Sequence, residues 1–109
     1  MEGIVALVRE VLTDDLLKPG YRGHCYAASE AVFWHEGGLD AGHSMMQIRH
    51  EGVSHWFVRL EDGTVLDPTA DQFLTPVPYG SARQNNGFVR QHGVSKRAAE
   101  ILRRVHDRA

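Results

Sequence analysis

The chain has 109 residues, of which 42% are hydrophobic, and its formal net charge is −2 at pH 7. A chain of this length holds one hydrophobic core of modest size, so we expect a single domain over residues 1–109, with no room for a second catalytic domain. The presence of only one cysteine excludes an internal disulfide framework and a zinc site built from several cysteines.

Nothing in the sequence predicts export or membrane insertion. The first residues, Met1 to Val5, lack the basic region and the long apolar stretch of a signal peptide. No segment approaches the ~20 apolar residues that a transmembrane helix needs. A free thiol without an export signal leads us to expect a reducing, cytoplasmic location.

Two helices are predicted in the first third of the chain. The first runs from Glu2 to Leu12, where apolar residues recur at helical spacing, and Lys18-Pro19-Gly20 stops any extension through Leu16 and Leu17. The second begins at Cys25 and ends at Gly37-Gly38. Its small alanines would let it pack closely against a sheet.

The middle of the chain reads as a short antiparallel sheet, and the end as a helix. Strands are predicted at residues 44–50, 55–60 and 64–67, with Asp62-Gly63 as a hairpin turn, followed by an irregular segment over residues 71–80. We predict a last strand at residues 87–91 and a helix from Lys96 to about Asp107, capped by Ser95. This order predicts an α+β fold, with N-terminal helices packed on the sheet.

Three residues in this arrangement suggest a nucleophilic site. The first turn of a helix favours a negative charge at Cys25, and a neighbouring imidazole can take the proton of the thiol. His55 opens one predicted strand, and the hairpin brings Asp67, at the end of the next strand, close to it. Asp67 would then accept a hydrogen bond from His55 and fix the ring. We expect Trp56 to shield that bond from water.

A resemblance to a known family extends this interpretation. The segments that carry it are Gly23-His24-Cys25-Tyr26-Ala27-Ala28, the helix end Gly37-Gly38-Leu39, His55-Trp56 and Asp67-Pro68-Thr69. Over roughly residues 21–73 the chain resembles the transglutaminase-like branch of the papain-like cysteine enzymes, including small bacteriophage proteins of that fold. The resemblance implies a papain-like domain in which Cys25, His55 and Asp67 form the catalytic triad.

The reaction implied is attack on an amide, isopeptide or thioester carbonyl through a thioester intermediate, with no cofactor. Peptidase, isopeptidase, amidase, deamidase and transglutaminase chemistry share these first steps, so the sequence leaves the choice among them open. The backbone N–H of Cys25 is the natural oxyanion donor, together with a second group that the sequence does not identify. We expect His24, Tyr26 and Trp56 to contact a protein or peptide-like substrate.

Other readings of the same residues remain open. Cys25 alone would suit a buried apolar position, His55 a structural role in a strand, and Asp67 a turn before Pro-Thr. Seven histidines keep a metal in consideration, but no pair has the spacing of a helical or Cys-x-x-Cys ligand set, and we predict none.

Charge is distributed unevenly along the chain. Residues 1–82 carry a net charge of −7 and residues 83–109 a net charge of +5. The basic end could pack beside the acidic body, or contact an acidic protein or nucleic acid. The alternative function is therefore a papain-like binding module with an unused triad.

Overall fold

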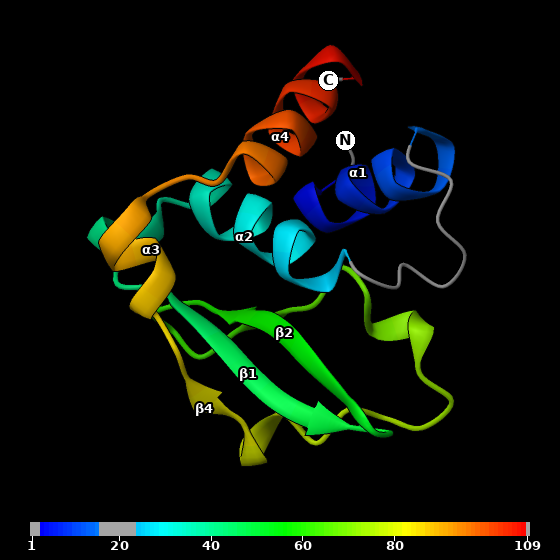
Figure 1. Ribbon diagram of the computed structural model, residues 1–109, viewed down its shortest axis with the longest axis vertical. Helices are drawn as coiled ribbons and strands as arrows, with labels where there is room; N and C mark the ends of the chain where they lie inside the picture. Colours follow the sequence, from blue (N-terminus) through cyan, green and yellow to red (C-terminus); the bar gives the residue numbers. More distant parts are fainter. Residues whose placement is uncertain (1–2, 16–23, 109) are drawn as a thin grey trace.

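Helices and sheet occupy opposite sides of the molecule in the computed structural model, which describes residues 3–15 and 24–108. Within those residues there are four α-helices and a four-stranded antiparallel sheet, as expected for an α+β domain. Helices α1, α2 and α4 lie together above the sheet, with α2 next to β2 (Figure 1). Both expected layers are therefore present.

The sheet has the strand order β3-β2-β1-β4. Strands β1 (Ser44–His50) and β2 (Val53–Arg59) pair along their whole length. Their two turn residues, Glu51 and Gly52, both have positive φ, which suits a tight hairpin with right-handed strand twist. Because this turn needs only two residues, β2 begins two residues earlier than predicted. Strand β3 (Val65–Leu66) is short and pairs only with the end of β2.

The first two helices follow the predicted order. Helix α1 (Ile4–Glu10) continues as a π-helical turn (Val11–Asp15), and α2 spans Cys25–His35. Helix α2 ends where Gly37 adopts a left-handed φ of 115°, as the Gly-Gly pair predicts. The predicted stop at residues 18–20, and any extension of the first helix through residues 16 and 17, lie outside the described residues.

The predicted strand at residues 87–91 is wrong, because this segment is helix α3 (Gly87–His92). The place beside β1 belongs instead to β4 (Arg83–Gln84), which pairs with Met46 and Gln47. After β4 the Asn86 side chain accepts a hydrogen bond from the Met45 backbone N–H at 2.7 Å. Because β1 is already paired on both edges, residues 87–92 form their backbone hydrogen bonds within a helix instead.

Helix α2 lies at the centre of the core. Most of its side chains are buried, and they pack against α1, α4 (Lys96–Arg108) and β2. Its buried Glu30 carboxylate accepts a hydrogen bond from the Ser95 backbone N–H at 2.8 Å. Ser95 in turn accepts from the Ala98 N–H at 3.2 Å, so the predicted cap of α4 is confirmed.

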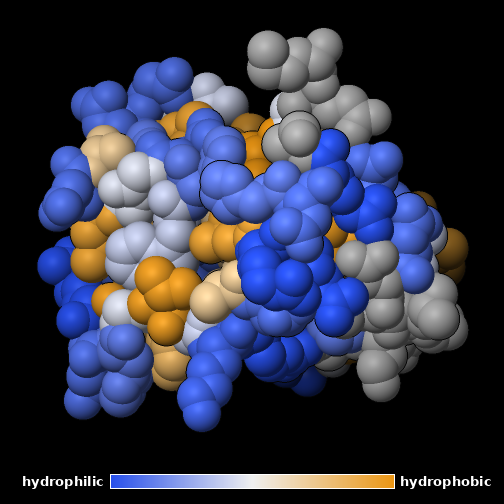
Figure 2. Space-filling view, turned by 90° about the horizontal axis from the view of Figure 1, so that it is seen from above, coloured by the Kyte–Doolittle hydropathy of each residue, from blue (hydrophilic) through white to orange (hydrophobic). Residues whose placement is uncertain are grey.

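The outer surface of the helical layer is mostly hydrophilic, with smaller hydrophobic areas between the polar side chains (Figure 2). None of the described helices combines the length and the apolar character that crossing a bilayer would need.

Candidate active site

Helix α2 lies against the edge of β2 where β3 stops. Two side chains of α2, one helical turn apart, contact two carbonyl oxygens of β2 that both point to this edge. The Ser29 hydroxyl donates to the Trp56 carbonyl at 2.8 Å, and Cys25 Sγ lies 3.7 Å from the Ser54 carbonyl oxygen. Four residues of helix rise about 6 Å and two residues of strand about 6.8 Å, so the two spacings match. This match holds the partly exposed thiol beside the residue that precedes His55.

His55 points to the face of the sheet opposite Trp56 and is completely buried. Its Nε2 lies 2.7 Å from Asp67 Oδ2, so the proximity expected from the hairpin is confirmed. Asp67 is itself only 7% exposed. A buried carboxylate at this distance fixes the ring orientation and keeps a proton on Nε2, which leaves Nδ1 as the nitrogen that can exchange a proton.

Asp67 is held by groups that come from distant parts of the chain. The Tyr79 hydroxyl donates to Asp67 Oδ2 at 2.8 Å, and the Thr69 backbone N–H donates to Oδ1 at 3.3 Å. From α1, Arg9 donates to the carbonyls of Pro68 and Asp67 at 3.0 and 3.4 Å. Burial and the bond to Asp67 raise the pKa of Tyr79, so its hydroxyl stays a donor. The aspartate is thereby fixed on both sides.

Aromatic rings other than Trp56 cover the histidine. The Phe73 ring meets the His55 ring edge-on with centroids 4.7 Å apart, and Phe57 stacks at 6.3 Å. The expectation that Trp56 shields the bond between His55 and Asp67 is wrong. Successive side chains of a strand point to opposite faces, and the Trp56 ring instead contacts Tyr26 at a centroid distance of 4.7 Å.

The electrostatics of His55 depend on both expected partners. Burial alone would lower the pKa of His55, but the hydrogen bond and charge of Asp67, together with the neighbouring Cys25 side chain, raise it to about 9. An imidazolium is thus favoured at neutral pH, and the thiol contributes to favouring it. Cys25, His55 and Asp67 are therefore brought together in one cluster.

Gln72 adds a polar group beside the open nitrogen of His55. Its Nε2 lies 3.4 Å from His55 Nδ1 and 3.3 Å from Thr69 Oγ1. The carboxamide can donate to a neutral Nδ1, or turn its oxygen toward a protonated one. Gln72 sits on a short 3₁₀ turn (Ala70–Gln72) that follows the aspartate.

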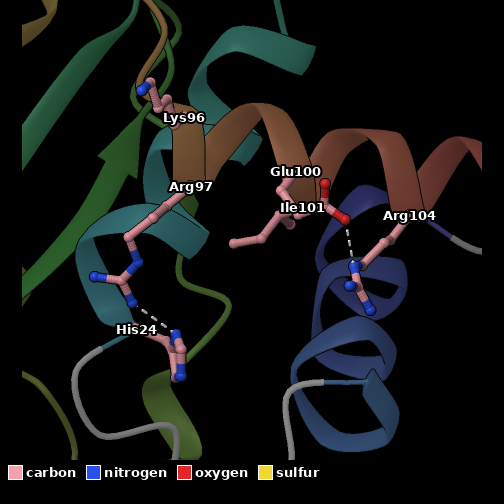
Figure 3. Close-up of a pocket in the computed structure, with 6 residues that line it drawn as sticks. All are labelled: His24, Lys96, Arg97, Glu100, Ile101 and Arg104. Atoms are coloured by element: carbon pink, nitrogen blue, oxygen red, sulfur yellow. Dashed lines mark hydrogen bonds and ion pairs between the residues drawn. The ribbon is translucent and has the colours of Figure 1, made fainter.

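The three predicted substrate contacts occupy different surroundings. Tyr26 and Trp56 are partly buried and pack against each other, and Phe88 of α3 meets Tyr26 with centroids 5.7 Å apart. His24 is only 9% exposed and points toward α4, where Arg97 donates to its Nδ1 at 2.8 Å (Figure 3). It lines a hollow beside α4 together with Ile101 and other side chains.

The basic C-terminal segment forms ion pairs within the chain. Glu100 accepts hydrogen bonds from Arg103 and Arg104, which lower its pKa to about 2, and Arg108 reaches Asp14 at 3.3 Å. Part of the positive charge is therefore balanced locally. In the described part of the chain, no group of three or more His, Cys, Asp or Glu side chains is arranged to hold a metal ion.

Several residues around this cluster were not predicted. Arg9 belongs to α1, for which the sequence suggested no functional role. Tyr79, Gln72 and Phe73 belong to residues 71–80, which were predicted only to be irregular. That segment passes the turn between β1 and β2, where the Thr75 N–H donates to Glu51 at 2.7 Å (Figure 1). No local pattern predicts such long-range contacts.

In comparisons with protein-family models, curated proteins and solved structures, nothing matches the chain.

Proposed function

We propose that the chain is a papain-like cysteine enzyme that transfers acyl groups through a thioester on Cys25. The observation that carries the proposal is the buried bond of 2.7 Å between His55 and Asp67, beside a thiol that helps to raise the His55 pKa to about 9. A partly exposed thiol paired with an oriented imidazole is the arrangement that nucleophilic catalysis requires.

In the proposed reaction, His55 takes the proton of Cys25 at Nδ1, and the thiolate attacks the carbonyl carbon. The carbon–nitrogen bond of the amide then breaks, and His55 gives the proton to the leaving nitrogen. Water then attacks the thioester carbon and gives a proton to His55. The carbon–sulfur bond breaks, which releases the acid and restores the Cys25 thiolate beside the protonated His55. An amine in place of water would complete a transfer, and a glutamine side chain in place of a peptide bond would be deamidated.

A thioester enzyme of this kind needs its thiol reduced, so we propose that the protein works in a reducing compartment such as the cytoplasm. The alternative from the sequence is a binding module that contacts an acidic protein or nucleic acid through residues 83–109. It has less support, because several of the arginines of α4 pair with carboxylates of the chain. Salt-dependent retention on DNA that survives Cys25→Ala would favour it.

The proposal is tested with p-nitrophenyl acetate at pH 6.5. We expect a stoichiometric burst of p-nitrophenolate and one acetyl group on Cys25 by mass spectrometry, formed faster than acetylation of glutathione at the same pH. Cys25→Ala should abolish the burst, and His55→Ala should slow it, while circular dichroism checks that both variants fold. Acetylation at the rate of a free thiol, or on other residues, would overturn the proposal.

A further inference from the structure

A polar hollow lies next to the strand segment that holds the thiol. It has a volume of about 340 Å³ and is lined by residues of β1, β2 and the region of β4: Gln47, Ile48, Arg49, Ser54, Ser81 and Arg83. Ser54 links the two places, because it lines the hollow, its Oγ accepts from Gln47 at 2.9 Å, and its carbonyl oxygen lies 3.7 Å from Cys25 Sγ. The hollow and the thiol are therefore joined through a single residue of β2.

The hollow carries two arginines on one face of the sheet. Arg83 pairs across the strands with Gln47, and Arg49 lies two residues further along β1, so it is the diagonal neighbour of Arg83. Such neighbours lie roughly 7–8 Å apart, with their β-carbons somewhat closer, which is within reach of long side chains. No lining residue is acidic, and the ion pairs among the described residues include neither arginine.

Both guanidinium groups are held in place by neutral acceptors. Gln47 Oε1 accepts from Arg83 at 3.2 Å and from Asn85 at 3.0 Å, while the Gln47 amide donates to Ser54 Oγ at 2.9 Å. Arg49 donates to the Gly52 carbonyl at 3.1 Å. Each of these bonds uses one of the five N–H donors of a guanidinium group, which leaves donors and a full positive charge for a ligand.

We infer that this hollow is a substrate subsite that binds an anionic group, a carboxylate or a phosphate, beside the segment of β2 that contacts Cys25. The inference rests on the proposed function, because it names the substrate class of the same site. Paired arginines recognise such groups through parallel N–H donors. Acidic or phosphorylated peptides are then preferred over their neutral counterparts.

Binding is measured on a Cys25→Ser variant, so that the readout does not depend on catalysis. Backbone amide shifts are followed by NMR during titration with acetyl-Ala-Glu-Ala-amide, its Gln counterpart and its phosphoserine counterpart. The two anionic peptides should shift the signals of residues 47–49, 54 and 81–83, and the Gln peptide should not. Since both arginines are exposed, Arg49→Gln and Arg83→Gln should each weaken binding about two- to fivefold. Arg90→Gln, on the exposed side of α3, should leave binding unchanged.

A second measurement places the bound anion relative to the thiol. In the protein with Cys25 intact, a saturating anionic peptide should slow alkylation of Cys25 by iodoacetamide. Equal binding of Glu and Gln peptides, shifts elsewhere in the chain, or binding without protection of Cys25 would each overturn the subsite. Failure of the acetylation burst with these binding results intact would overturn the enzyme and leave an anion site. An intact burst without anion preference would overturn the subsite alone.

Discussion

Replacing Asp67 by asparagine tests the electrostatic core of the site. The substitution keeps the shape of the side chain and removes the charge that lies 2.7 Å from His55 Nε2. A hydrogen bond to a charged group contributes about 1.5–3 kcal/mol, which corresponds to about 1–2 units of pKa. With burial still favouring the neutral ring, the pKa of His55 should fall from about 9 to about 7–8 or below.

The same substitution changes how stability depends on pH. The folded pKa of His55 lies above its ordinary value of 6.5, so the stabilisation from its protonated form is complete below pH 6.5 and is lost as the pH rises through about 9. Asp67→Asn should reduce this decline and should cost about 2 kcal/mol near pH 6, because the protonated ring of His55 loses its charged partner.

Both effects can be measured directly. Long-range ¹H–¹⁵N spectra of the histidine rings give the titration midpoint of His55, and urea unfolding at several pH values gives the stability. Asp40→Asn, on an exposed carboxylate, is the matched control and should change neither. The reasoning is refuted if the midpoint of His55 is the same with and without the Asp67 charge, or if it lies below 6.5 in the unmodified protein.

Two further predictions concern the contacts that position α2. Ser29→Ala removes the 2.8 Å hydrogen bond to the Trp56 carbonyl and should lower the free energy of unfolding in urea by about 1–3 kcal/mol. Ser81→Ala, on the exposed surface, is the control and should lower it by less than about 0.5 kcal/mol. Equal losses would contradict the role of Ser29 in holding α2 against β2. Gly38→Ala places a methyl group 2.6 Å from a tryptophan ring at a φ of 62°, and Gly52→Ala meets nothing within 4 Å at a φ of 81°. Both should destabilise the fold, and the first by at least about 1 kcal/mol more. The reverse order in thermal unfolding would contradict the close approach of residue 38 to the Trp34 ring.

The elements that were predicted well are those with local signals. Helix α2 starts and ends as predicted because a Gly-rich boundary at Gly37-Gly38 stops an apolar helical run. The hairpin around Asp62-Gly63 sets the distance between His55 and Asp67 through chain connectivity alone. The closeness of His55 and Asp67 could therefore be predicted from the sequence.

Other features depend on contacts that the local sequence does not encode. Phe88 and Val89 suggest a strand by composition, but Val89 is buried in a helix because β1 is already paired with β4. A two-residue strand such as Arg83–Gln84 has no recognisable pattern of its own. The wrong prediction that Trp56 shields His55 could have been avoided from the sequence. Successive side chains of a strand point to opposite faces, so Trp56 and His55 must lie on opposite faces of β2.

The partners of Asp67 could not be predicted for a different reason. Tyr79 reaches Asp67 only because a proline-rich segment folds back over the sheet, and Arg9 reaches the same region across 58 residues of chain. Such contacts depend on the final packing of the whole domain. These contacts also hold Asp67 in place beside His55.

The most direct test of the central claim is the rate at which iodoacetamide alkylates Cys25 as a function of pH. If His55 accepts the thiol proton, Cys25 should react well below pH 8, and His55→Ala should shift that reactivity to the range of an ordinary cysteine. A rate profile in the unmodified protein that matches free cysteine, or one that His55→Ala leaves unchanged, would contradict the pairing of thiol and imidazole on which the proposed function rests.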